Sequence, residues 1–307
     1  MSENLIDLAV TQFSANLEMK IQQKGSKLRG RVAEGTHVGK QASPVQYLGP
    51  VKVQVPAGRF APLAPVHPTF ERRWVFPKDR DLPQLVDSFD ELRLISDPKS
   101  QYSSNAAAAV AREWDDQLIA AAKADARIGT DVDALSTESF DDTTYGVAVN
   151  YGASAANGLT VAKLRELKRK MRHYAQDGSD DDEMMTILIG SQQESDLLAE
   201  TQITNSDYNG DRPVLVDGSI KRFLGFDFIV SERLAVASNV RSCIAFMKSG
   251  LYLGIWSDTS TTPSIRNDLS GHPYQLYTKF TVGATRLQKG KLFEVKCSDT
   301  TGASITP

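Results

Sequence analysis

The chain has 307 residues, which fits two domains or one domain with large excursions, and 41% of its residues are hydrophobic, which is enough for real cores. Its formal charge of -3 argues against a dedicated nucleic-acid-binding protein, whose surface is usually basic. Its two cysteines, Cys243 and Cys297, are far apart and lack a neighbouring metal ligand, so we expect reduced thiols in a cytosolic protein. The acidic N-terminal stretch has no long apolar run, which predicts neither a signal peptide nor a membrane anchor.

Residues 3–28 predict an amphipathic helix, because apolar residues recur every four positions. They are Leu5, Ala9, Phe13, Leu17 and Ile21. Such a terminal helix needs a surface to lie on. That surface is either its own domain or a neighbouring subunit.

Residues 33–78 predict a two-stranded excursion with a tip rich in proline and glycine. Val51, Val53 and Val55 alternate with polar residues, and a second extended run begins at Phe70. A lone hairpin is marginal in water, so we expect this arm to pack on something else. Its charged return limb suits a partner surface, and an ordinary solvated hairpin is the alternative interpretation.

An alanine-rich helix organises the chain between Ser96 and Arg127. Ser103, Ser104 or Asn105 can cap its start, and alanine loses no side-chain entropy on becoming helical. At 1.5 Å per residue the helix is a rod of roughly 30 Å. One face is predicted to pack against a sheet and consists of Ala107, Val110, Trp114, Leu118 and Ala121.

A second helix is predicted over residues 161–175. Its inward positions are Val161, Leu164, Leu167 and Met171. The other face carries Lys163, Arg165, Lys168, Arg169, Lys170 and Arg172. This basic face could meet nucleic acid, lie in solvent, or pair with the acidic run Asp177–Glu183. That run lacks the spacing of a calcium loop, so it predicts no metal site.

The rest of the chain alternates short apolar runs with turns, which together with the helices predicts an α+β protein. A short helix is expected from Ser191 to Glu200. The expected strands are Met185–Gly190, Phe223–Val230, Cys243–Met247, Leu251–Trp256, Tyr274–Arg286 and Lys291–Cys297.

No catalytic motif is present: the sequence has no nucleophile elbow, phosphate loop, zinc-protease helix or dinucleotide fingerprint. The four histidines lie in unrelated contexts, and Asp115 and Asp116 point about 100° apart on a helix. We therefore expect no enzyme, no cofactor and no metal. A hydrolase built from scattered Asp, Glu and His residues is the enzymatic alternative.

The order of the elements resembles the major capsid proteins of tailed bacteriophages, which have the Hong Kong 97-like fold. The resemblance covers nearly the whole chain and rests on four stretches. The first is Asp97–Tyr102, which leads into the alanine-rich helix with Arg112 and Asp115-Asp116. The second is Met185–Gly190, which is followed by a short helix and Asn205–Tyr208. The third is Gly218–Ser231, and the fourth is Lys279–Arg286.

This resemblance implies a domain map. It consists of an N-terminal arm (1–35), an extended loop (36–78), a peripheral domain with a spine helix (79–160 and 273–298), an axial domain (161–272) and a C-terminal tail (299–307). It implies intersubunit contacts from Phe13 and Leu17 of the arm and from Phe70, Arg72, Arg73 and Trp74 of the loop. Val110, Trp114 and Leu118 would pack the spine helix, and Lys168, Arg169 and Arg172 would be a genome-facing or paired basic face.

The implied function is self-assembly, as hexamers and pentamers, into an icosahedral shell around double-stranded DNA. The implied partners are the chain itself, a portal protein, a separate scaffolding protein, a decoration protein and packaged DNA bound without sequence specificity, with no membrane. Assembly would occur in the host cytoplasm. The alternatives are an encapsulin-like nanocompartment shell and a tail or baseplate component.

Overall fold

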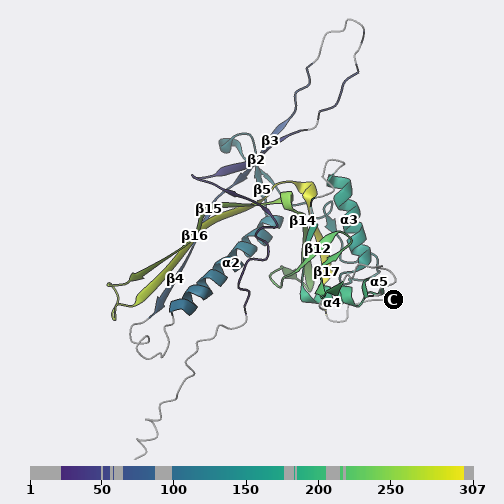
Figure 1. Cartoon of the computed structure of the whole chain (residues 1–307). Helices are drawn as coiled ribbons and strands as arrows, with labels where there is room; N and C mark the ends of the chain where they lie inside the picture. Colours follow the sequence, from purple (N-terminus) through teal and green to yellow (C-terminus); the bar gives the residue numbers. More distant parts are fainter. Residues whose placement is uncertain are drawn as a thin grey trace, which may run out of the picture. The chain divides into compact units, whose positions relative to one another are not determined.

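The computed structural model describes residues 22–49, 51–55, 58, 65–86, 99–175, 183, 185–204, 215–216 and 219–300 (Figure 1). The chain divides into two compact units. The first comprises residues 1–26, 79–113 and 257–281, and the second comprises residues 27–78, 114–256 and 282–307. The division falls inside α2 (Lys99–Lys123), β15 (Leu251–Ile265) and β16 (Tyr274–Arg286), so these elements contribute to both units. Helix and strand occur in each unit, which confirms the predicted α+β class.

The core of the second unit is a seven-stranded sheet in the order β11-β12-β8-β14-β17-β7, with β13 paired to β14. The parallel pairs are β8 with β12 and β7 with β17, whereas β14 runs antiparallel to both β8 and β17. The strands are β7 (Gly146–Val147), β8 (Met185–Ile189), β11 (Arg222–Phe223), β12 (Phe226–Val230), β13 (Val236–Ala237), β14 (Val240–Met247) and β17 (Leu292–Ser298). The central strands β8 and β14 are almost wholly buried, as expected of continuous apolar runs.

Helix α3 (Val161–Ala175) runs beside this sheet in Figure 1. Its inward residues Leu164, Leu167 and Met171 are fully buried, and Val161 is nearly so, which confirms the predicted helix and its apolar face. After β8 come α4 (Ser191–Leu198), which confirms the predicted short helix, and α5 (Thr201–Thr204). A small pair, β9 (Leu215–Val216) and β10 (Ser219–Ile220), follows.

The seven-stranded sheet joins segments that the sequence analysis assigns to different domains. Strands β8, β12 and β14 lie within residues 161–272, whereas β17 lies within residues 273–298. The C-terminal strand thus pairs in one sheet with strands of the expected axial domain.

A second sheet of this unit has the order β2-β3-β5-β6. Its strands are β2 (Ala42–Leu48), β3 (Phe70–Val75), β5 (Ala126–Ile128) and β6 (Ser136–Glu138). Strands β2 and β3 pair antiparallel, with a bulge between Ala42 and Val45, and form the base of the predicted two-stranded excursion. The pairing confirms the prediction at the base of the excursion. The predicted strand pattern of Val51, Val53 and Val55 is wrong in this subunit, because these residues lie in no regular element.

The remaining sheet has the order β1-β15-β16-β4. Strand β1 (Ala33–Thr36) pairs in parallel with Tyr252–Ile255 of β15. In the first unit, β15 and β16 continue as a long hairpin, and β4 (Lys78–Val86) follows β16 in the order. Arg80 of β4 forms an ion pair with Glu113 of α2, over 2.9 Å from Nε to Oε1, within the same unit.

Helix α2 buries the predicted packing residues Val110, Trp114 and Leu118, whose exposed fractions are 5%, 3% and 0%. Ala107 lies on the same stripe but is exposed. Residue spacing predicts which face of a helix is apolar, but it does not predict over which turns other elements pack on that face. The helix begins by Lys99, so the predicted caps Ser103, Ser104 and Asn105 are wrong: these residues lie inside the helix.

Arg286 closes the C-terminal end of α2. Its guanidinium is almost fully buried and donates to the backbone oxygens of Ala122 (3.1 Å), Ala124 (3.2 Å) and Glu138 (3.0 Å). The last carbonyls of a helix have no intrahelical partner, and a cation at this end also complements the helix dipole. One arginine of β16 therefore fixes both α2 and β6.

Candidate functional site

The base of the β2–β3 excursion is held by a buried charge cluster of its own chain. Arg73 of β3 is 5% exposed and forms ion pairs with Glu71 and Glu138. The other oxygen of Glu138 lies 2.8 Å from the ammonium of Lys289. Burial alone would raise the pKa of Glu138, but hydrogen bonds from Arg73 and Lys289 outweigh burial and lower that pKa. The ionised carboxylate thus ties β3 to β6 and to the turn before β17.

Two further side chains fix the same base. The indole Nε1 of Trp74 donates to the backbone oxygen of Gly129 over 2.9 Å, and Arg72 donates to that of Thr130 over 3.3 Å. Three of the four predicted loop contacts are therefore engaged within the chain. The fourth, Phe70, is 53% exposed. An intersubunit role for all four stays a prediction.

Beyond this base, apolar side chains stand in solvent. Val51, Val53 and Val55 are 57%, 99% and 91% exposed, and Leu48 is also mostly exposed. The stretch from 36 to 70 contains no aspartate or glutamate, whereas it carries Lys40, Lys52 and Arg59. The excursion is thus a basic arm with an uncovered apolar stripe.

The predicted contacts of the N-terminal helix, Phe13 and Leu17, lie outside the described residues. The predicted helix over 3–28 is wrong at its described end, because residues 22–28 are not helical.

In residues 27 and 28, the backbone N–H groups donate to a carboxylate of α2, whereas in a helix they would donate to carbonyls of the preceding turn. The N–H groups of Lys27 and Leu28 donate to Asp115, over 3.0 and 3.2 Å. The guanidinium of Arg29 lies over the ring of Trp114, 4.3 Å from its centroid. Asp115 is itself almost fully buried, so the chain entering β1 is bonded directly to α2.

The basic face predicted for α3 is wrong at Lys163, which is fully buried. Its ammonium donates to the backbone oxygens of Val149 (2.8 Å), Asn157 (2.9 Å) and Lys296 (3.0 Å). All three of its protons therefore have acceptors, and burial lowers the pKa of this lysine. Lys163 fixes a loop to β17 and is not part of a surface.

The three residues predicted to form a genome-facing or paired basic face differ in their surroundings. Lys168 donates to the backbone oxygen of Leu224 over 2.8 Å, and Arg169 forms a two-pronged bond with Glu166 over 2.8 and 2.6 Å. Arg172 is exposed and has no ion-pair partner within the described part of the chain. The face is thus partly paired, and its contact with a genome stays a prediction.

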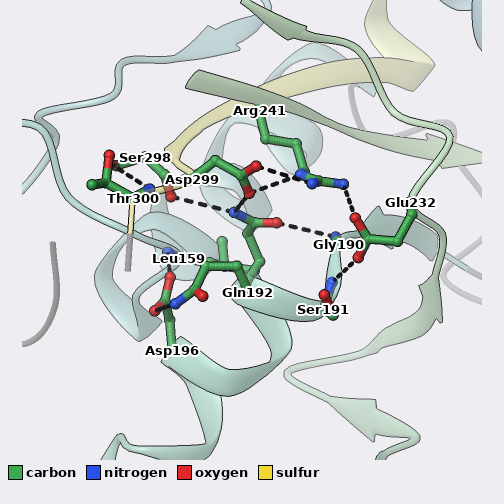
Figure 2. A network of polar contacts seen from close by, with 11 residues as sticks. Leu159, Gly190, Ser191, Gln192, Asp196, Glu232, Arg241, Ser298, Asp299 and Thr300 are labelled. Carbon is green, nitrogen blue, oxygen red and sulfur yellow. Dashed lines mark hydrogen bonds and ion pairs between the residues drawn. The ribbon is translucent and has the colours of Figure 1, made fainter. Parts of the chain in front are cut away.

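A polar network joins β14, α4 and the end of β17 (Figure 2). Arg241 of β14, 7% exposed, forms two parallel bonds to Asp299, from Nε to Oδ1 (2.9 Å) and from Nη2 to Oδ2 (3.0 Å). Its third nitrogen lies 2.7 Å from Glu232, whose other oxygen accepts the N–H of Ser191 over 2.6 Å. Glu232 thereby satisfies an orphan donor in the first turn of α4.

Gln193 extends the network to the residue that ends β17. Its amide donates to Asp299 (3.1 Å) and to the backbone oxygen of Ser298 (3.3 Å), and its own oxygen accepts the N–H of Gly190 (3.2 Å). The bond from Arg241 lowers the pKa of Asp299 despite its partial burial. No sequence motif predicts this network. The one signal in the sequence is an arginine, Arg241, inside the apolar run of β14.

The lower part of Figure 2 shows a third carboxylate, Asp196 of α4. It accepts the N–H of Leu159 over 3.3 Å and the side-chain amide of Gln192 over 3.0 Å. A Cβ atom on Gly158 would overlap this carboxylate, so the close approach requires glycine. Burial raises the pKa of Asp196. These contacts are structural, because every polar group faces another from the same chain.

The described residues contain no cluster of three or more His, Cys, Asp or Glu side chains that could hold a metal. A cavity of about 510 Å³ lies beside α3, but its charged groups are engaged: Lys296 is 2.6 Å from Asp142, and Lys170 donates to the backbone oxygen of Gly146 over 2.6 Å. Cys243 and Cys297 are both buried and free, as expected of reduced thiols. No helix in the described ranges is long and apolar enough to cross a bilayer.

Comparisons with known proteins agree on one family. A family model described as phage capsid protein matches residues 5–299. No curated protein sequence matches the chain. The capsid structure of cyanophage P-SCSP1u has a TM-score of 0.70 at 14% identity, over 96% of this chain and 94% of that one.

Two further solved capsids are similar. Cyanophage Pam1 has a TM-score of 0.70 at 11% identity, over 94% of this chain and 96% of that one. The capsid of Helicobacter pylori bacteriophage KHP30 has a TM-score of 0.68 at 10% identity, over 97% of this chain and 99% of that one. At these identities the likeness shows the fold, and the family model shows the membership. Together they confirm the resemblance to phage capsid proteins: the chain belongs to the phage capsid protein family.

Proposed function

We propose that this chain is a major capsid protein that assembles, as hexamers and pentamers, into an icosahedral shell around double-stranded DNA. The observation that carries the proposal is the β2–β3 excursion, whose base is clamped by Arg73 and Glu138 while Val53 and Val55 are almost wholly exposed. Full burial of one valine is worth about 1.5 kcal/mol or more. Covering the stripe on another copy would therefore contribute several kcal/mol per subunit.

The domain map follows as part of the proposal. Residues 1–35 act as an arm, 36–78 as the extended loop over a neighbour, 79–160 and 273–298 as the peripheral domain, and 161–272 as the axial domain around each ring centre. The partners are further copies, a portal protein, a separate scaffolding protein, a decoration protein and DNA held without sequence specificity. Assembly takes place in the host cytoplasm, and the protein performs no catalysis.

Negative-stain electron microscopy of the protein expressed alone, and with its neighbouring genes, tests this function. Closed polyhedral shells, or rings of five and six subunits, support it. Shells that package protein and no DNA in infected or induced cells would replace the viral role with that of a nanocompartment. A monodisperse monomer or small oligomer under both conditions would overturn the proposal.

A further inference from the structure

The outer edge of β15 is open over most of its length. Strand β1 pairs with it only as far as Ile255, whose backbone oxygen accepts the last bond on that side, from the N–H of His37 over 2.9 Å. Strand β16 occupies the other side. From Ser257 to Ile265, every side chain is exposed, and no strand of the described ranges pairs with this edge.

Two other outer strands in the described sheets, β4 and β2, carry features that disfavour strand addition. The outer strand β4 carries charges of both signs and a proline: Lys78, Asp79, Arg80, Asp81 and Pro83. Strand β2 has a bulge near Ala42. Charges, prolines and bulges are the usual devices that prevent an edge from pairing. The stretch from Ser257 to Thr262 has one charge, Asp258, and its proline comes only at Pro263.

The same chain contains an extended segment without a strand partner. On the outgoing limb of the excursion, the last backbone bond among the described residues is from Gly49 to Thr69, over 2.7 Å. Val51–Val55 follow in no regular element, with valines at alternate positions and Lys52 between them. Alternation places the three valines on one face of a strand once the segment pairs.

We propose that, in the assembled shell, Val51–Val55 of one copy add as a strand to the Ser257–Thr262 edge of β15 in a second copy. The inference rests on the proposed function, because it needs two copies side by side. Backbone pairing supplies the attachment, as in other cases of strand addition to an open edge. Lys52 meets the edge that bears Asp258, and the valines come beside the β-branched Thr259 and Thr261, which are favourable cross-strand neighbours.

Cysteine cross-linking in assembled particles tests the pairing. Val53→Cys combined with Thr259→Cys places one thiol on each proposed partner, and the native Cys243 and Cys297 are buried and do not compete. To cover neighbouring registers of the same face, Val51→Cys and Val55→Cys are each combined with Thr259→Cys as well. The matched control is Val53→Cys with Leu85→Cys, since Leu85 is an exposed residue on the guarded strand β4.

In at least one Thr259 pair, oxidised shells should show covalent multimers on a non-reducing gel, at least tenfold above the Leu85 control. They should vanish with reductant and be absent from unassembled subunits. Cross-links with Leu85 instead of Thr259, or none from any of the three Thr259 pairs, would overturn the proposal.

Hydrogen–deuterium exchange on the unmodified protein gives a test that needs no variant. Backbone amides of both segments, Val51–Val55 and Ser257–Thr262, should exchange at least tenfold more slowly in shells than in free subunits. Shells that leave either segment unprotected would overturn the strand pairing and leave the capsid function standing. Failure of the unmodified protein to form shells would instead count against the proposed function.

Discussion

At the scale of single residues, Lys163 is a charge held entirely inside the second unit, with three backbone oxygens as its partners. Replacing it by methionine keeps the apolar stem and removes all three donors. A buried acceptor left without a partner costs about 1–3 kcal/mol. Because neighbouring groups relax, we expect Lys163→Met to lower the free energy of unfolding by about 3 kcal/mol.

Urea unfolding of unassembled subunits measures this loss. Arg165→Met, on the exposed side of the same helix, is the control and should change stability by no more than about 0.5 kcal/mol. Equal stabilities for the two variants would mean that the lysine bonds contribute nothing to the fold.

The Arg241–Asp299 pair predicts a dependence on pH. Because its bond to Arg241 lowers the folded-state pKa of Asp299, the carboxylate stabilises the fold above its unfolded pKa of about 4. That contribution is lost as the pH falls through the folded pKa. Asp299→Asn should cost about 2 kcal/mol at pH 7, since it breaks a largely buried pair that Glu232 still partly neutralises.

Denaturant unfolding at a series of pH values from 7 downwards checks the sign. The difference in the free energy of unfolding between the native chain and Asp299→Asn should shrink as the solution becomes acidic. The exposed Asp133→Asn serves as the control. A difference that stays constant down to about pH 3 would contradict an ionised Asp299 as its source.

Single residues were predictable where periodicity alone decides. Leu164, Leu167 and Met171 are buried because each is apolar and lies on the inward stripe of α3. The burial of Lys163 was not predictable, because its long side chain packs its stem inward and its ammonium donates to carbonyls that only the folded loops bring near. Asp115 was missed for the same reason: its partners are backbone N–H groups of residues 27 and 28.

At the scale of elements, the predicted helix over 161–175 and the predicted strand Tyr274–Arg286 match α3 and β16. Thr160 precedes the helix, and its hydroxyl accepts the N–H of Lys163 over 3.4 Å. The strand is followed by a turn at Lys289–Lys291. Strand β15 extends to Ile265, beyond the predicted end at Trp256. The second half of the strand is polar, so no apolar pattern predicts it, and pairing with β16 keeps it extended. Polar strands of this kind carry little signal in sequence.

The extended loop gives a prediction at the element scale. Its clamp residues Arg73 and Trp74 belong to β3, whereas the exposed valines lie farther out. Deleting residues 40–70 should therefore leave a soluble, folded subunit that cannot form closed shells, because the apolar stripe and its backbone are gone.

Circular dichroism and electron microscopy of this deletion test both halves of the expectation. Replacing 51–55 by a glycine–serine segment of equal length is the milder companion variant. Normal shells from the full deletion would refute the assigned role of residues 36–78. If the deletion variant does not fold, shell formation by the companion variant tests the role of the loop instead.

At the scale of the whole molecule, the order of elements indicated the family, although no single motif did. Domain boundaries were less accessible, because strands distant in sequence meet in one sheet: β17 pairs with β14 through Cys243 opposite Val295. Long-range pairing of this kind depends on the complete fold. The amino-acid composition also shows no shift at the positions where the two units divide, so it does not mark the boundaries.

The last prediction concerns charge on the whole shell. With a net charge of -3, a subunit that encloses DNA needs its cations gathered where the genome lies. Arg165, Arg169 and Arg172 are all exposed on α3, but Arg169 is paired with Glu166, and the half-buried Lys168 donates to a backbone oxygen. Among the described residues, Arg165 and Arg172 are therefore the exposed cations of α3 without an ion pair. Reversing all of Lys168, Arg169 and Arg172 would disturb contacts of the fold as well as charge.

Arg165→Glu combined with Arg172→Glu isolates the charge. If this face meets the genome, the variant should assemble normally and release its DNA at a lower salt concentration than the native shell, because phosphate contacts give binding a steep salt dependence. Lys248→Glu with Lys279→Glu makes the same change in net charge at exposed sites on other elements and is the control. DNA retention as a function of salt and temperature, followed by dye access, separates the two variants. Equal retention would mean that the face is merely solvated.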